Sequence, residues 1–163
     1  MNVILIGTNG AGKTTMATRL YKDGYHMFRE APMGNHHAPA AMLCMSDLHI
    51  VFDRWNVIDR LIYEEENQYL DIITMDPKLI NRNNVIIYLQ NDVVPYDGAM
   101  NDSRSVQRPS EKTRKDLDKA YYEYTLLLSK KGIMVYHVKV FKDVEDTYRL
   151  IKSIIKCHVP GGN

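Results

Sequence analysis

The segment that most constrains the fold of this chain is NVILIGTNGAGKTTMATRL, at residues 2–20. It begins with a short apolar run at residues 3–6, which is rich in β-branched residues and typical of a buried strand. Residues 7–14 follow at once and match the pattern G-x-x-x-x-G-K-[ST] at every fixed position. Because residues 15–20 can continue as a helix, the sequence predicts a strand, a glycine-rich loop and a helix in direct succession, as a phosphate-binding loop requires.

The residue types in this loop suit an anionic ligand. Glycine tolerates backbone angles and close approaches that a Cβ atom would block, so successive N–H groups can turn inward around a phosphate at the positive end of the helix. Lys13 can reach the β- and γ-phosphates, and the Thr14 hydroxyl can ligate Mg²⁺. A ligand-free turn would not explain why glycine, lysine and threonine stand in register. The sequence therefore predicts a nucleoside triphosphate site formed by Asn9, Gly10, Ala11, Gly12, Lys13, Thr14 and Thr15.

Size and composition limit the remaining classes. A chain of 163 residues is long enough for one domain, and its formal charge of +1 gives no general attraction to nucleic acid or membrane. Cys44 and Cys157 lack metal or redox spacing, which favours free thiols in a reducing compartment. There is no membrane-length apolar run and no signal peptide, so we expect a soluble cytoplasmic protein.

Hydrophobic periodicity predicts an α/β fold with helices and strands in alternation. Continuous apolar runs are typical of parallel strands, which are buried on both faces. The strands are expected at 3–6, 25–28, 48–52, 84–89 and 133–140, the last of these at a sheet edge because it alternates. The helices are expected at 14–22, 56–74, 78–81, about 113–130, and 143–156.

A carboxylate and a guanidinium follow the third predicted strand, as Asp53 and Arg54. Because the carboxyl ends of parallel strands line the ligand crevice of open α/β sheets, both are candidates for function. Asp53 can accept a proton from an attacking hydroxyl or help to hold hydrated Mg²⁺, and Arg54 can clamp a phosphate of the acceptor. The alternative is an exposed ion pair near the start of the next helix.

Residues 90–112 form the least hydrophobic segment and are rich in Asn, Asp, Ser, Pro and Gly. A loop of this length inside a compact domain is usually functional, so we interpret residues from about 95 to 112 as a lid. Arg104 and Arg108 lie within it, with Arg114 just beyond, and such arginines can close over a triphosphate and neutralise charge during transfer. The alternative is a solvated loop with ordinary surface charge.

The order of these features resembles the thymidylate kinase branch of P-loop nucleotide and nucleoside kinases, including short bacteriophage deoxynucleoside monophosphate kinases. The segment Phe28 to Gly34 is similar to the family's R-E-P-G-G, with an inserted alanine, and Asp53-Arg54-Trp55 matches its D-R-[YHW]. Tyr63 matches a family tyrosine on the following helix. Asn9 stands where thymidylate kinases usually carry an acidic residue.

The resemblance implies a three-layer P-loop NTPase fold, with a five-stranded parallel sheet flanked by helices and an Arg-bearing lid, in a single kinase domain over residues 1–163. It implies ATP and Mg²⁺ as cofactors, with Thr14 and Asp53 at the metal. Family members are often homodimers, and the apolar stripe of 57–73 would permit one here. If the chain is phage-encoded, its compartment would be the host cytoplasm. The implied catalytic residues are Lys13, Asp53, Arg104 and Arg108, and the implied substrate-binding residues are Arg29, Arg54, Trp55 and Tyr63.

Three functions remain open at this point. The favoured one is transfer of the γ-phosphate of MgATP to a deoxynucleoside monophosphate, with Trp55 or Phe28 stacking on the base. The second is a kinase of deoxynucleosides, or of a 5-hydroxymethylated pyrimidine in phage DNA, in which Asp53 acts as a base. Nucleic acid as a partner is less favoured because of the neutral overall charge. The third is a nucleotide-dependent switch or binding module. The base that is accepted does not follow from the sequence.

Overall fold

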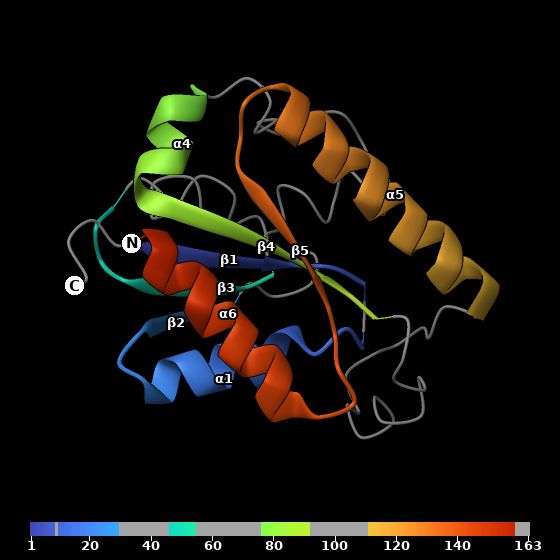
Figure 1. Ribbon diagram of the computed structural model, residues 1–163, viewed down its shortest axis with the longest axis horizontal. Coiled ribbons are helices and arrows are strands. Elements are labelled where there is room, and N and C mark those ends of the chain that lie inside the picture. The colour runs from blue at the N-terminus through green and yellow to red at the C-terminus, as the bar shows by residue number, and fades with distance from the viewer. Residues whose placement is uncertain (9, 30–45, 55–75, 92–110, 159–163) are drawn as a thin grey trace.

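The computed structural model describes residues 1–8, 10–29, 46–54, 76–91 and 111–158. They form a five-stranded parallel sheet in the order β2-β3-β1-β4-β5, flanked by helices (Figure 1). The strands are β1 (Asn2–Ile6), β2 (His26–Arg29), β3 (Ile50–Asp53), β4 (Asn84–Gln90) and β5 (Val135–Lys139). The helices are α1 (Lys13–Lys22), α4 (Pro77–Asn83), α5 (Glu111–Lys130) and α6 (Val144–His158). The expected five-stranded parallel sheet flanked by helices is therefore confirmed.

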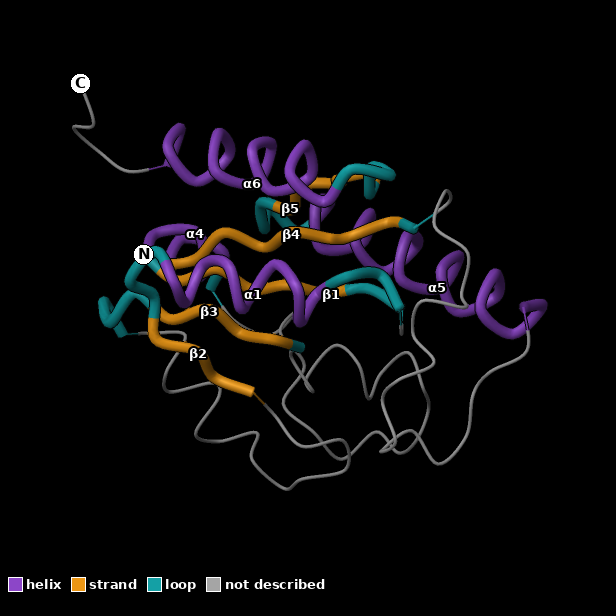
Figure 2. The backbone as a smooth tube through the Cα atoms, turned by 90° about the horizontal axis from the view of Figure 1, so that it is seen from below, coloured by secondary structure: helices purple, strands orange, loops and turns teal. Residues whose placement is uncertain are grey.

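The sheet is enclosed by two hydrophobic cores, one on each face. On one face, alternate residues of the central strands pack with Ile80 of α4 and with Tyr121 and Leu128 of α5. On the other face, the intervening residues pack with Leu20 of α1 and Ile151 of α6. Figures 1 and 2 show the resulting layers, with α1 and α6 together on one side of the sheet. All residues of β1 are buried, which explains the uninterrupted apolar run.

Most element boundaries differ from the sequence prediction by one or two residues, and two of these differences have a clear local reason. The third strand begins at Ile50 and not at residue 48, because His49 has a φ of 53°, which is incompatible with an extended strand. Helix α4 begins at Pro77, one residue before its predicted start, because the side chain of Asp76 caps it by accepting from the Lys78 N–H at 2.9 Å and Pro77 suits its first position. It also continues to Asn83, two residues beyond its predicted end. Strand β5 is an edge strand, as the alternating pattern predicted.

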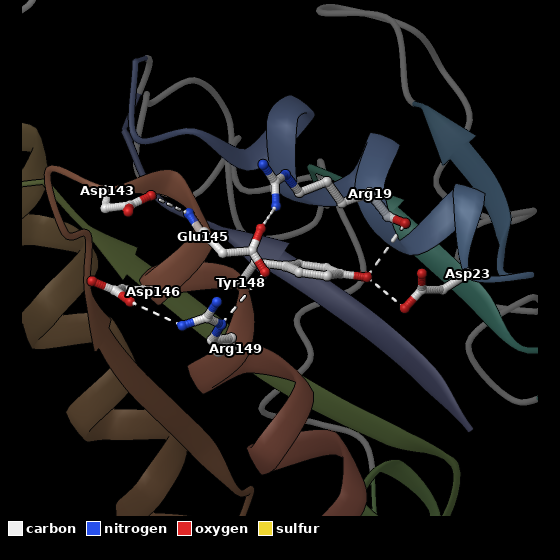
Figure 3. A network of polar contacts seen from close by, with 7 residues as sticks. All are labelled: Arg19, Asp23, Asp143, Glu145, Asp146, Tyr148 and Arg149. Atoms are coloured by element: carbon white, nitrogen blue, oxygen red, sulfur yellow. Dashed lines mark hydrogen bonds and ion pairs between the residues drawn. The ribbon is translucent and has the colours of Figure 1, made fainter.

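Helices α1 and α6 are joined by a polar network at the surface, which Figure 3 shows in close view. Arg19 of α1 pairs with Glu145 of α6, and the Tyr148 hydroxyl donates to Asp23 at 2.5 Å. Lys152 also pairs with Asp23. The hydrogen bonds from Lys152 and Tyr148 lower the pKa of Asp23 from 3.8, whereas burial and the neighbouring Asp23 raise the pKa of Tyr148.

In the part of the chain that the structure describes, no helix combines the length and the apolar character needed to cross a bilayer. The predicted helix at 56–74, with its apolar stripe, lies outside the described residues. So do residues 95–110 of the predicted lid, whereas its last two residues, 111 and 112, belong to α5.

Candidate active site

The glycine-rich loop connects the end of β1 at Ile6 to the start of α1 at Lys13. Gly7, Gly10 and Gly12 have φ angles of 140°, 83° and 84°, a backbone region that favours glycine. At Gly7 the restriction is also steric, because a Cβ atom there would lie 2.5 Å from the carbonyl oxygen of Leu89. The loop is thus held against the end of β4.

The N-terminus of α1 points into this loop without competition from side chains. No side chain caps it, and its first turn contains no acidic residue. Its first backbone hydrogen bond runs from Met16 N–H to Gly12 O at 3.0 Å. By helix geometry, the N–H groups of Thr14 and Thr15 have no acceptor within the helix, so they and the helix dipole can act on an anion.

Lys13 is enclosed by the loop that precedes it. Its side chain is 5% exposed, and its Nζ donates to Gly7 O and, at 2.8 Å, to Thr8 O. A buried ammonium must be compensated, and here two backbone carbonyl dipoles contribute. The ammonium is therefore held within the turn formed by the glycine-rich loop.

Asp53 is fully buried at the carboxyl end of β3. Among the described residues, neither of its carboxylate oxygens accepts a hydrogen bond, although Arg29 Nε lies 3.5 Å from Oδ2. Val51, two residues earlier, and Leu5, which is opposite Asp53 in β1, pack in the core beneath α1. Because side chains alternate along a strand, Asp53 lies on the same face of the sheet as α1. The alternative prediction of an exposed ion pair is wrong.

The partner of Asp53 is Arg29, which follows from the strand order. Arg29 is the last residue of β2 and is opposite Asp53 in the parallel register. Its side chain is 49% exposed, so its guanidinium can bind both the buried carboxylate and a ligand at the surface. Arg54 follows with a φ of 82°, an unfavourable value for a residue with a side chain. Strain of this kind is often found at functional sites.

The oxygen-bearing side chains at this site suit a magnesium ion whose other ligands are phosphates and water. The described residues contain no group of three His, Cys, Asp or Glu side chains that would hold a metal without other ligands. Mg²⁺ usually takes only one or two protein oxygens and completes its octahedron with phosphates and water. Thr14 at the start of α1 and the buried carboxylate of Asp53, which accepts no hydrogen bond from a described residue, lie on the same face of the sheet and are suitable for this.

Several predicted site residues lie outside the described part of the chain: Asn9, Trp55, Tyr63, Arg104 and Arg108. The side chain of Arg114 also lies outside it. Phe28 is described, and its ring packs against the Phe52 ring of the core at 5.5 Å between centroids. The glycine-rich loop, Arg29, Asp53 and Arg54 thus all lie at the carboxyl ends of neighbouring strands, β1, β2 and β3. The lid remains a prediction.

One residue near the loop was missed by the sequence analysis. Asn91 directly follows β4, is 8% exposed, and donates from its Nδ2 to Gly10 O at 3.1 Å. The only signal in the sequence was its place at the end of a predicted strand, in a segment rich in polar residues. Its contact depends on β4 lying next to β1, which the sequence pattern did not determine.

Comparison with known proteins gives relatives in structure but not in sequence. No protein-family model matches the chain, and no curated protein matches it. The YorR protein from Bacillus subtilis, solved in complex with phosphorylated GDP, is 20% identical with a TM-score of 0.64 over 97% of this chain and 98% of its own. Deoxyadenosine kinase from M. mycoides with bound dCTP is 18% identical with a TM-score of 0.60, covering 96% and 100%.

A third similar structure is thymidylate kinase from Ehrlichia chaffeensis, at 11% identity and a TM-score of 0.52, covering 95% of this chain and 98% of its own. At these identities the likeness concerns the fold. The chain therefore has the fold of the P-loop nucleotide and nucleoside kinases, with its glycine-rich loop between β1 and α1.

Proposed function

We propose that this chain is an ATP-dependent phosphotransferase that transfers the γ-phosphate of MgATP to a deoxynucleoside monophosphate. The observation that carries the proposal is the enclosed Lys13 ammonium at the start of an uncapped helix, because this arrangement concentrates positive charge on a polyphosphate. The proposal is also supported by solved proteins of the same fold, which are named as a deoxyadenosine kinase and a thymidylate kinase or were solved with a bound nucleotide.

In the proposed reaction, the glycine-rich loop and Lys13 hold the β- and γ-phosphates of the donor. Mg²⁺, held by Thr14 and Asp53 with the phosphates, would neutralise charge on the phosphates. The acceptor phosphate is bound by Arg29 and Arg54 at the adjacent strand ends. The protein contributes positioning and electrostatic stabilisation, since phosphoryl transfer requires little covalent help from a side chain.

The remaining predicted residues complete this proposal. Arg104 and Arg108 of the lid would close over the moving phosphoryl group, and Trp55 and Tyr63 would bind the nucleoside of the acceptor. The thymidylate-kinase-like character, the phage origin and a homodimer through the 56–74 helix belong to the same proposal.

A second candidate is a deoxynucleoside kinase, which the structural likeness to a deoxyadenosine kinase brings into consideration. A neutral hydroxyl acceptor must lose a proton, and a buried carboxylate that accepts no hydrogen bond from a described residue can take it. On this alternative, Asp53→Asn should lower kcat by at least about a hundredfold for a nucleoside acceptor.

The test is to follow ADP release with MgATP and panels of nucleosides, monophosphates and hydroxymethylated duplex DNA. Stimulation by one monophosphate supports the first candidate, and stimulation by a nucleoside supports the second. Lys13→Ala should reduce turnover by at least about a hundredfold, because a charge-assisted contact to the phosphates is lost. Lys22→Ala, at the other end of α1, is the control. No stimulation by any acceptor would exclude both kinase functions and favour a nucleotide-dependent switch.

A further inference from the structure

Asn91 connects the end of β4 to the glycine-rich loop. Its side chain is nearly buried, and its Nδ2 donates to the carbonyl oxygen of Gly10 at 3.1 Å. A buried amide side chain in hydrogen-bond contact with a backbone carbonyl fixes the direction in which that carbonyl points. The contact therefore concerns the orientation of one peptide group in the middle of the loop.

The Gly10–Ala11 peptide group is held at both of its ends. Its carbonyl accepts from Asn91, and its N–H, on Ala11, donates to Thr8 O at 3.2 Å. Gly10 has a φ of 83° and no side chain to restrict rotation of this peptide. A loop that binds phosphate turns N–H groups toward the ligand and carbonyl groups away from it. A rotated carbonyl would face the anion with its negative end.

A second contact fixes the start of the same loop. The packing of Gly7 against Leu89 O leaves no space for a Cβ atom. Leu89 and Asn91 are two residues apart at the end of β4, so this strand end supports the loop at its first residue and at its middle. The strand end therefore acts as the outer wall of the phosphate-binding loop.

We propose that Asn91 is a positioning residue that keeps the Gly10 carbonyl turned away from the place where the loop binds the β-phosphate of the donor nucleotide. The inference rests on the proposed function, because it assumes that the loop binds a polyphosphate. We therefore expect Asn91 to affect the affinity for ligands with two or more linked phosphates. It should not affect the binding of the acceptor at Arg29 and Arg54.

The test compares Asn91→Asp and Asn91→Ala with the wild-type protein by isothermal titration calorimetry with ADP and with inorganic tripolyphosphate. Both variants should bind both ligands about tenfold more weakly, which is the effect of one lost hydrogen bond. Asn91→Asp, which keeps the shape and removes the donor, should be the weaker of the two, because its carboxylate repels the Gly10 carbonyl and the phosphates. The KM for the acceptor should stay unchanged.

Asn81→Ala is the matched control. Asn81 also bonds to backbone, donating to Gly132 O at 2.8 Å and accepting from Met134 N–H at 2.9 Å, but it lies in α4 at the opposite end of β4. This variant should lower the urea midpoint of unfolding and leave the affinity for ADP unchanged. If Asn91→Asp and Asn91→Ala unfold, Asn91→Ser, which is neutral, polar and too short to reach Gly10 O in the same way, takes their place.

The outcomes separate the two proposals. If the wild-type protein binds ADP and tripolyphosphate, and the Asn91 variants bind them equally well, the inference about Asn91 is wrong and the proposed function stands. If Asn81→Ala loses affinity to the same extent, the effect is one of general stability and the inference is also wrong. If the wild-type protein binds neither ligand, the proposed function fails, and the inference fails with it.

Discussion

Gly7 is the residue at which the loop depends most directly on packing. Replacement by alanine combines a φ of 140° with a Cβ atom 2.5 Å from Leu89 O, so the loop must move away from β4. We expect Gly7→Ala to lower the free energy of unfolding by about 2–3 kcal/mol and to weaken ADP binding by at least about tenfold. Urea unfolding and calorimetric titration measure these two effects.

Gly24 provides the control for this substitution. It has a φ of 99°, but a Cβ atom there would meet no atom within 4 Å. Gly24→Ala should therefore show only the cost of the left-handed backbone, about 1 kcal/mol, with full affinity for ADP. Equal losses of ADP affinity in the two variants would show that the contact with Leu89 has no part in nucleotide binding.

For single residues, the sequence predicted the position of a side chain where all the residues of a motif lie close together in the chain. Gly12 and Lys13 are specified by the loop pattern itself, and in the structure they lie where the loop meets α1. The Arg29–Asp53 pair and the Asn91 contact join residues from different strands. They follow from the strand order, which a single sequence with repeated apolar runs does not specify.

At the scale of elements, the network between α1 and α6 gives a prediction for pH. The pKa of Asp23 lies below its ordinary 3.8 because Lys152 and Tyr148 bond to the ionised form. Its contribution to stability is therefore fully present above pH 3.8 and is lost as the pH falls through the lower value in the folded state.

We therefore expect Asp23→Asn to reduce the free energy of unfolding by about 0.5–1 kcal/mol at pH 7, as for partly exposed ion pairs. The difference from the wild-type protein should decrease as the pH falls below 3.8, and urea unfolding at pH 7 and pH 3 measures it. Asp76→Asn serves as a control, because it removes an acidic side chain at the start of α4, outside this network, that accepts only from the nearby Lys78 N–H among described contacts. A difference that is the same at both pH values would contradict the prediction.

The elements themselves were predicted well because each is encoded within its own segment. Buried parallel strands have continuous apolar runs, and α6 has an amphipathic pattern, with Ile151 and Ile155 in the core. The errors arose at ends, where one backbone angle or one cap decides. The backbone angle of His49 delays the start of β3 to Ile50, and the cap at Asp76 starts α4 at Pro77, one residue before the prediction.

At the scale of the whole molecule, the loop links ligand binding to global stability. It connects β1 to α1 and is held by β4, three elements that pack in one core, so a ligand that binds the folded loop should stabilise the entire domain. At a hundredfold excess over its dissociation constant, MgADP should add about 2.7 kcal/mol to the free energy of unfolding. For a chain of this size, the midpoint of thermal unfolding should rise by roughly 5–10 °C.

Two variants show whether this stabilisation passes through the loop. Gly7→Ala should have a lower midpoint without ligand and a much smaller increase with MgADP, because the same concentration then exceeds a weaker dissociation constant by less. Asp23→Asn, at the far end of α1, should also start lower but keep the full increase. Differential scanning fluorimetry with and without MgADP measures both. An equal increase in all three proteins would place the nucleotide away from the loop, and no increase in the wild-type protein would remove the basis for assigning a nucleotide to it.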